Sequence, residues 1–92
     1  MTETKRYAYK YIRNGEYAIY MFDGVERNGR LEADSYTVYT TKEHGSKGTK
    51  LFVDQEIVFS VDSAYDTIEE VLEEVEAEST NKLNYFRKEF KL

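Results

Sequence analysis

A chain of 92 residues with a net charge of −5 and no cysteine has room for one small domain, and it lacks both disulfides and thiolate metal sites. No apolar run approaches the roughly 18 residues that a membrane-spanning helix needs. The first ten residues, MTETKRYAYK, are charged where a secretion signal is apolar. We therefore expect one domain over residues 1–92, in a reducing cytoplasm and without a membrane partner.

The first part of the chain predicts an antiparallel hairpin. Residues 5–13 alternate tyrosines with other residues, which is the two-residue period of a strand. Asn14-Gly15 fits a type I′ turn, because both central residues of that turn need a positive φ, and residues 16–22 form the returning strand. This register pairs Arg13 with Glu16, Tyr11 with Ala18, Tyr9 with Tyr20 and Tyr7 with Phe22.

A second turn of the same type is predicted at Asn28-Gly29. It leaves Gly24 as a kink inside a long strand and pairs Ile19 with Val38. A turn at Asp23-Gly24 is the alternative. We prefer the later turn because it places apolar residues opposite apolar ones, although Arg27 then faces Arg30.

Two further strands complete the predicted sheet. Residues 35–41, SYTVYTT, have the composition of a strand. Residues 42–50, KEHGSKGTK, are polar with two glycines and are expected to form a mobile loop. Residues 51–61 return to an apolar, strand-like pattern. Residues 5–61 therefore predict a four-stranded antiparallel β-meander.

Helices are predicted after the sheet, which gives an α+β fold. Asp62 or Ser63 is expected to cap a long helix over residues 63–79. Its apolar residues follow the i, i+3, i+4 spacing of a single buried stripe, and they are Tyr65, Ile68, Val71, Leu72 and Val75. Residues 81–92 predict a short C-terminal helix with Leu83, Phe86 and Phe90 on one side. A final strand is the alternative there, because aromatic residues also suit sheets.

The alternation of side chains predicts two different sheet faces. One face receives the helix stripe, and it gathers Ala8, Ile12, Tyr17, Ile19, Met21, Tyr36 and Val38. The other face is strongly aromatic, and it gathers Tyr7, Tyr9, Tyr11, Tyr20, Phe22 and Tyr39. An exposed patch of that kind is larger than most monomers tolerate. We therefore expect a homodimer that associates through Tyr7, Tyr9, Tyr11, Tyr20 and Phe22.

The sequence contains no pattern that predicts catalysis. His44 is the only histidine, and it lies in the glycine-rich loop without the further ligands that a metal site needs. No nucleophile-elbow, phosphate-binding or EF-hand motif is present. The paired glutamates of the helix face solvent, where nothing separates their pKa values for acid–base work. We expect a non-enzymatic protein without a cofactor or metal.

The acidic residues of the predicted helix are the first candidate for a binding surface. Residues 51–79 carry ten acidic and no basic side chains, whereas ordinary exposed helices mix lysine with glutamate. Seven acids over about 18 Å of helix axis give a charge spacing comparable to the roughly 1.7 Å of duplex DNA. A solvated surface is the plain alternative. The expected partner-binding residues are Asp62, Asp66, Glu69, Glu70, Glu73, Glu74, Glu76 and Glu78.

In size, charge and the acidic stretch from Asp62 to Glu78, the chain resembles the small, acidic, cysteine-free early proteins of bacteriophages. That group includes DNA-mimic inhibitors of histone-like HU proteins, of uracil-DNA glycosylase, of restriction enzymes and of CRISPR effectors. The resemblance implies a host-takeover protein of the bacterial cytoplasm, with no catalytic residues. The basic tail, with Lys82, Arg87, Lys88 and Lys91, departs from the fully acidic type and offers counter-charges to the helix glutamates.

Three functions are therefore weighed. The leading hypothesis is an inhibitor or modulator that presents the acidic helix to a basic DNA-binding protein, such as HU or a nuclease effector, and does not itself bind duplex DNA. The second is a structural or assembly protein that acts through the tyrosine-rich sheet face. The third is a single-stranded nucleic-acid-binding module, in which the tyrosines stack on bases and the phosphate backbone of the nucleic acid is contacted by Lys5, Arg6, Lys10 and Arg13.

Overall fold

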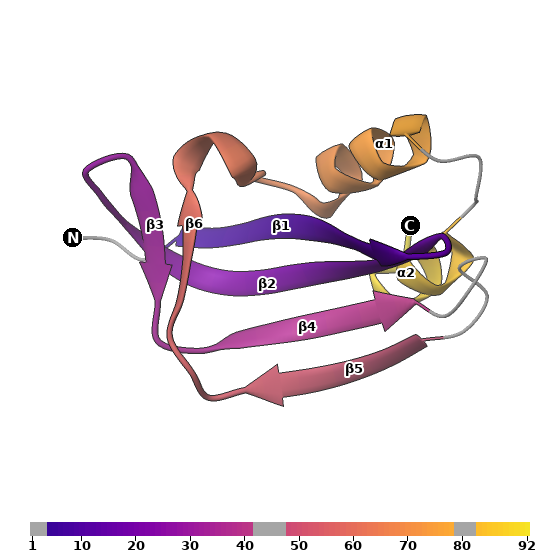
Figure 1. Ribbon diagram of the computed structural model, residues 1–92, viewed down its shortest axis with the longest axis horizontal. Helices are drawn as coiled ribbons and strands as arrows, with labels where there is room; N and C mark the ends of the chain where they lie inside the picture. The colour runs from indigo at the N-terminus through magenta and orange to yellow at the C-terminus, as the bar shows by residue number, and fades with distance from the viewer. Residues whose placement is uncertain (1–3, 42–47, 79–82) are drawn as a thin grey trace.

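The computed structural model describes residues 4–41, 48–78 and 83–92 and has the predicted α+β fold (Figure 1). The sheet has six antiparallel strands, not four, and an 11-residue helix and a short C-terminal helix follow it. In chain order the elements are β1 (Thr4–Arg13), β2 (Glu16–Arg27), β3 (Arg30–Ala33), β4 (Tyr36–Thr41), β5 (Gly48–Val53), β6 (Ile57–Ser60), the 3₁₀ turn η2 (Val61–Ser63), α1 (Ile68–Glu78) and α2 (Asn84–Glu89).

Both predicted Asn-Gly turns are confirmed. Asn14-Gly15 and Asn28-Gly29 have φ values of 49° and 53° at the asparagines and 78° at both glycines, as a type I′ turn requires. Gly24 lies inside the long strand β2, and the arginines that flank the second turn face each other. The alternative turn at Asp23-Gly24 does not form.

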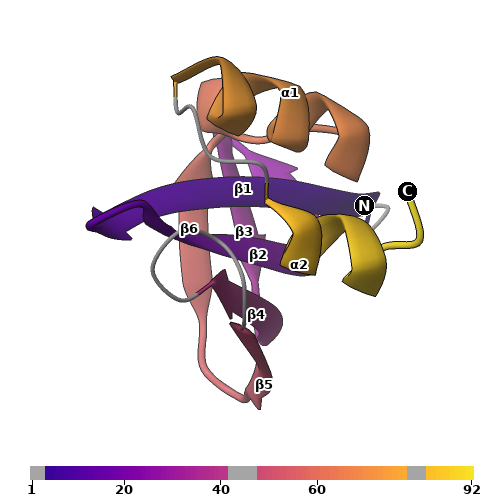
Figure 2. The same ribbon diagram turned by 90° about the vertical axis from the view of Figure 1, so that its right-hand side faces the viewer.

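The long strand β2 joins two parts of the sheet. Residues 18–21 lie between β1 and β4, whereas residues 25–27 pair with β3. β5 extends the first part beyond β4, and β6 extends the second part beyond β3. The sheet therefore bends around β2, and β3 and β6 run across the direction of β1, β2 and β4 (Figures 1 and 2).

A bulge at Ile12 changes the register between β1 and β2 by one residue. Arg13 faces Glu16 as predicted, but beyond the bulge the cross-strand pairs are Tyr11–Tyr17, Tyr9–Ile19 and Tyr7–Met21. The predicted pairings with Ala18, Tyr20 and Phe22 are therefore wrong. Because successive side chains alternate between faces, a slip of one residue turns the tyrosines of β1 to the opposite face of the sheet.

The two strands beyond the predicted four are β3, which precedes the strand predicted over residues 35–41, and one that arises from a break in the strand predicted over residues 51–61. Asp34 and Ser35 separate β3 from β4. The register of β4 on β2 is therefore one residue later than predicted, and Ile19 faces Tyr39 instead of Val38. Residues 54–56 separate β5 from β6, so the single strand predicted over residues 51–61 is wrong. β5 begins at Gly48, inside the predicted loop, and residues 42–47 with His44 lie outside the described residues.

The helices begin later than the sequence indicates. Asp62 and Ser63 lie in η2, and α1 starts at Ile68. Tyr65 precedes α1 but still packs against its core, while the other four residues of the predicted stripe are buried. Residues 84–89 form a helix, which decides against the alternative C-terminal strand. Neither helix in the described part of the chain is long and apolar enough to cross a membrane.

The core divides into two clusters on opposite sides of the sheet. The larger lies between the sheet and both helices, with Tyr17, Ile19, Tyr39, Ile68, Val71, Leu72, Val75, Leu83 and Phe86 buried. The smaller contains Ala8, Phe22, Leu31 and Ala33, and Phe59 of β6 stacks on Phe22 with ring centroids 5.4 Å apart. Ala8 and Tyr36 therefore lie on the side away from the helices, contrary to prediction, and Ile12 is exposed.

Candidate interaction face on helix α1

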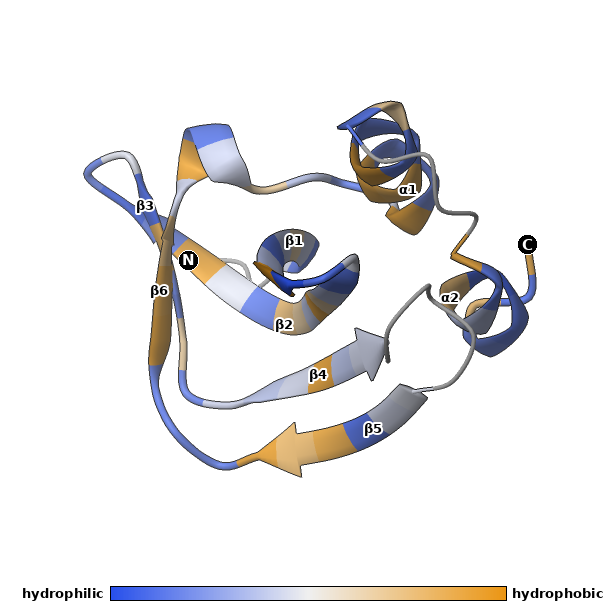
Figure 3. Cartoon of the chain, turned by 45° about the vertical axis from the view of Figure 1, so that its right-hand side comes forward, coloured by the Kyte–Doolittle hydropathy of each residue, from blue (hydrophilic) through white to orange (hydrophobic). Residues whose placement is uncertain are grey.

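Helix α1 has one buried and one acidic side. Ile68, Val71, Leu72 and Val75 are each less than a tenth exposed and pack against the sheet. The polar side of the helix faces away from β1 and β2 (Figure 3). This division follows from the 3.6-residue period of the sequence, and it places the glutamates along the outer surface of the molecule.

Thr67 fixes the first turn of α1. The Thr67 hydroxyl oxygen accepts a hydrogen bond from the Glu70 backbone N–H at 3.3 Å, and the same hydroxyl donates to the Glu70 carboxylate at 3.2 Å. Thr-x-x-Glu is the pattern of a capping box. The predicted caps, Asp62 and Ser63, are wrong because this better pattern begins at Thr67, further along the chain.

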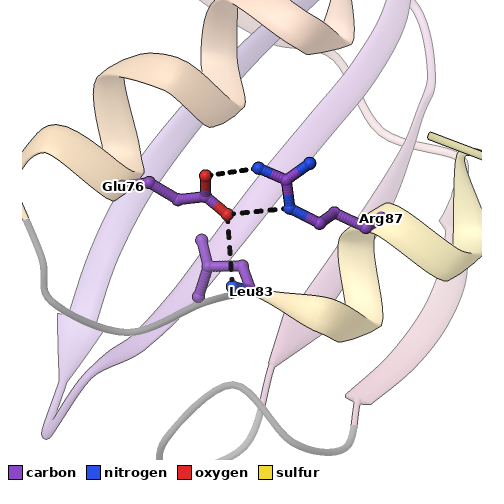
Figure 4. A network of polar contacts seen from close by, with 3 residues as sticks. All are labelled: Glu76, Leu83 and Arg87. Carbon is purple, nitrogen blue, oxygen red and sulfur yellow. Dashed lines mark hydrogen bonds and ion pairs between the residues drawn. The ribbon is translucent and has the colours of Figure 1, made fainter.

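Glu76 connects α1 with α2. Its carboxylate accepts hydrogen bonds from the Arg87 guanidinium, at 3.1 Å from Nε and 2.6 Å from a terminal nitrogen, and from the Leu83 backbone N–H at 3.4 Å (Figure 4). These bonds raise the pKa of the Arg87 guanidinium. The basic tail thus neutralises one helix glutamate, as its charge suggested, and this glutamate serves the fold.

Glu78 is also engaged within the molecule. The Tyr9 hydroxyl on β1 donates a hydrogen bond to Glu78 Oε1 at 3.1 Å. Burial of the Tyr9 side chain, together with the bond to Glu78, raises the pKa of Tyr9 to about 12. Burial and the nearby Glu74 carboxylate raise the pKa of Tyr65 as well. The end of α1 is therefore attached to the sheet through a tyrosine that keeps its proton.

Asp66 holds the segment that leads into α1. Its carboxylate forms an ion pair with the Arg6 guanidinium of β1. Beside it, the backbones of Tyr7 and Tyr65 exchange two hydrogen bonds, with N–O distances of 2.9 and 2.7 Å. The start of α1 is therefore fixed to β1 by paired backbone groups and by an opposite charge.

Four glutamates form the remaining outer surface, which we call the outer acidic face: Glu69, Glu70, Glu73 and Glu74. All four are exposed, and none forms an ion pair with a basic residue in the described part of the chain. Glu69 and Glu73 border a hollow of about 370 Å³ that Leu72, Arg87 and Leu92 also line. Glu70 and Glu74 lie on the other flank, near Tyr65.

Seven of the eight predicted partner-binding residues divide into two groups. Asp66, Glu76 and Glu78 bind other parts of the chain, whereas the outer acidic face is presented to solvent. Asp62 is exposed in η2, away from α1. The sequence indicated the basic tail, which includes Arg87, as a counter-charge for the helix glutamates, but it did not indicate Arg6 or Tyr9 as partners of Asp66 and Glu78. The only available signal for Arg6 was its opposite charge.

The predicted tyrosine-rich face does not exist as one surface. Tyr7 and Tyr9 pack against the larger cluster beneath the helices, and Tyr20 and Phe22 belong to the smaller cluster on the other side. Tyr11 is about half exposed, near the β1–β2 turn. The five residues expected to mediate self-association are thus separated by the sheet, because the bulge at Ile12 turned the tyrosines of β1 over.

The outer acidic face can attract and orient cationic groups through four carboxylates that form no ion pair within the described residues. Within the described ranges, no group of three or more histidine and acidic side chains is placed to hold a metal ion. Comparisons of the chain with protein-family models, with curated proteins and with solved structures found no match.

Proposed function

We propose that this protein is a non-enzymatic inhibitor or modulator that binds the cationic, DNA-binding surface of another protein with the outer acidic face. HU-like proteins and nuclease effectors are the classes of partner that have such a surface. The single observation that carries the proposal is the set of four exposed glutamates on consecutive turns of α1, none of which forms an ion pair within the described residues.

The spacing of these charges supports a DNA-like surface. Glu69 to Glu74 spans about 7.5 Å of helix axis at 1.5 Å per residue, so four charges occupy a length comparable to that of four phosphate charges in a duplex, at roughly 1.7 Å each. The two glutamates within each i, i+4 pair, Glu69/Glu73 and Glu70/Glu74, repel each other, and this repulsion weakens the helix. A partner with clustered arginine or lysine relieves that repulsion when it binds.

The internal bonds of the other acids favour the same function. Glu76, Glu78 and Asp66 fasten the two ends of α1 to α2 and β1. A rigid, prepositioned helix loses little conformational entropy on binding, which favours affinity. The acids at the ends thus hold the helix, and the outer acidic face between them remains available.

The rival function, assembly through a tyrosine-rich face, loses its basis because those tyrosines lie on both sides of the sheet. A single-stranded nucleic-acid platform is disfavoured for the same reason, since stacking needs adjacent exposed rings. Arg6 is one of the four basic residues expected to contact the nucleic-acid backbone, and it is instead paired with Asp66.

The proposal is tested by affinity capture from bacterial lysate with three proteins: the parent, a variant with Glu69, Glu70, Glu73 and Glu74 changed to Gln, and a charge-matched control. The control changes Asp23, Glu26, Asp34 and Glu56 to amides; these residues are exposed and lie outside α1. Both variants shift the net charge from −5 to −1.

We expect the parent and the control to retain the same basic DNA-binding protein, and the helix variant to lose it. Retention should be strong at 0.01 M salt and weaker at 0.1 M, where the Debye length falls from about 30 to about 10 Å. Added duplex DNA should release the bound protein. Equal retention by all three proteins, or retention that added DNA leaves unchanged, contradicts the proposal.

A further inference from the structure

Strand β5 forms an open edge of the sheet. Among the described residues it pairs with β4 alone, and it ends the strand order β5-β4-β2-β3-β6. Its Leu51 and Phe52 are 61% and 63% exposed, the largest fractions among the big apolar side chains of the described chain. The unpaired N–H and C=O groups of such an edge are a template for another strand.

The other two edges are less suited to pairing. β1 is bridged by Tyr65, whose backbone exchanges two hydrogen bonds with Tyr7. β6 has four residues against six in β5. β5 also lies at the far end of the sheet from α1, so that a partner on this edge leaves the acidic helix free (Figures 1 and 2).

We propose that β5 is a self-association edge, on which β5 of a second copy of this chain pairs antiparallel and joins the two sheets into one. The partner is inferred from the complementarity of β5 with itself. A two-fold axis perpendicular to the sheet keeps each side chain on its own face, and residues that are directly opposite share a face. A symmetric pair must therefore be centred on one residue that faces its own copy.

Centring on Phe52 matches every neighbouring pair. Phe52 then faces Phe52, Leu51 faces Val53, and Lys50 faces Asp54 on both sides of the axis. Opposite charges and apolar pairs across strands are the stabilising combinations. Lys50, Phe52 and Asp54 are all exposed in the single chain, where the Lys50 ammonium lies 5.5 Å from the centroid of the Tyr39 ring and turns from it to reach Asp54 of the second copy.

The neighbouring symmetric registers are mismatched. Centring on Leu51 sets Lys50 against Phe52, and centring on Lys50 sets two lysines against each other, which is destabilising. Centring on Val53 sets Phe52 against Asp54. Centring on Val53 does set Lys50 against Glu56, but among these registers only the one centred on Phe52 has an apolar centre, two flanking ion pairs and no apolar residue opposite a charged one. This self-complementarity favours a second copy over an unrelated strand.

Cysteine trapping tests the register directly, because the chain has no cysteine of its own. In Phe52→Cys the two thiols face each other across Cα atoms about 4.5–5.5 Å apart, within the range of a disulfide. In the matched control Leu51→Cys, which is equally exposed, the two residues are diagonal neighbours about 7–8 Å apart. We expect the Phe52→Cys dimer to form at least tenfold faster under mild oxidation.

Charge exchange tests the same register without a covalent bond. Lys50→Glu and Asp54→Lys should each weaken the dimer in sedimentation equilibrium, and the double variant should restore it with the charges reversed. Circular dichroism should be unchanged in all three, since both residues are exposed. A parent chain that stays monomeric at high concentration, a Leu51→Cys chain that oxidises as fast as Phe52→Cys, or a double variant as weak as the single ones would overturn the proposal.

Discussion

The Glu76 carboxylate on α1 accepts two hydrogen bonds from the Arg87 guanidinium on α2, at 3.1 and 2.6 Å (Figure 4). Paired bonds of this kind between arginine and a carboxylate fix orientation as well as distance. The third bond, from the Leu83 backbone N–H, places the start of α2 beneath α1. One acid of the helix therefore organises the packing of both helices on the sheet.

Removal of the Glu76 carboxylate should loosen α2. Glu76→Ala loses the bonds to Arg87 and Leu83, so we expect the free energy of unfolding to fall by roughly 1–2 kcal/mol. Glu73→Ala is the matched control, because Glu73 lies one turn earlier with its side chain exposed and no ion pair in the described residues. Urea unfolding measures the free energy of unfolding of both variants. Equal effects of the two changes would show that the contact between α1 and α2 adds no stability.

Gly48 allows β5 and α2 to approach each other. A Cβ atom at this position would meet the Thr40 carbonyl oxygen and, at 2.5 Å, the ring of Tyr85 on α2. Gly48→Ala should therefore destabilise the protein by about 1–3 kcal/mol, the range for overpacking. Leu51→Ala, in the same strand with its side chain exposed, should have little effect on the monomer. Thermal unfolding at low protein concentration compares the stability of the two variants. A Gly48→Ala protein as stable as the parent would contradict the close packing of β5 against α2.

The Tyr9–Glu78 contact predicts a loss of stability at alkaline pH. The unfolded chain releases the Tyr9 proton near pH 10, whereas the folded chain retains it until the raised pKa of about 12. Between these values the unfolded state binds fewer protons, so the free energy of unfolding falls as pH rises. Below pH 10 this contribution is fully present.

Tyr9→Phe should lose part of that pH dependence. The variant keeps the ring but has no hydroxyl to ionise, and at pH 7 it should be less stable by roughly 0.5 kcal/mol for the lost hydrogen bond. Tyr20, Tyr65 and Tyr85 also have raised pKa values, so the free energy of unfolding of both proteins falls as pH rises, and the difference between the two proteins reports on Tyr9. Denaturant unfolding at several pH values from 9 to 12 measures this difference. If it does not change with pH, Tyr9 does not contribute to the alkaline loss of stability.

The local features of the fold could be predicted from the sequence because local physics determines them. Asn14-Gly15 and Asn28-Gly29 are residues that tolerate positive φ, and the α1 stripe repeats with the helical period. The bulge at Ile12 could not be predicted, because no glycine or other distinctive residue marks it. A one-residue slip then reversed the tyrosines of β1. The break at Asp34 and Ser35 did have a signal, since aspartate is a poor strand former and both residues are common in turns.

The sequence predicts the acidic side of α1, but it does not predict which of its acids bind other parts of the chain. The period of α1 identifies which glutamates point outward, and the composition identifies the unbalanced charge. The division into internal acids and an outer acidic face depends on contacts with Arg6, Tyr9 and Arg87, which lie between 11 and 69 residues away in the chain. Pairing over such separations follows from the fold, which the sequence pattern alone does not specify.

Neutralising the outer acidic face should slightly stabilise the isolated protein. The variant with Glu69, Glu70, Glu73 and Glu74 changed to Gln removes two repulsive i, i+4 pairs, each worth a few tenths of a kcal/mol. Thermal unfolding of this variant should therefore occur at the parent's temperature or a little above it. A marked loss of stability would mean that these glutamates serve the fold.

Displacement of DNA shows whether the outer acidic face occupies the DNA-binding surface of the partner protein. The DNA-binding protein captured by the parent is loaded with a fluorescent duplex at low salt, and the release of the duplex is followed by anisotropy as each chain is added. We expect the parent and the control, with Asp23, Glu26, Asp34 and Glu56 neutralised, to displace the duplex equally, and the four-glutamine variant to leave it bound. Displacement by the four-glutamine variant at the parent's concentration would contradict this expectation.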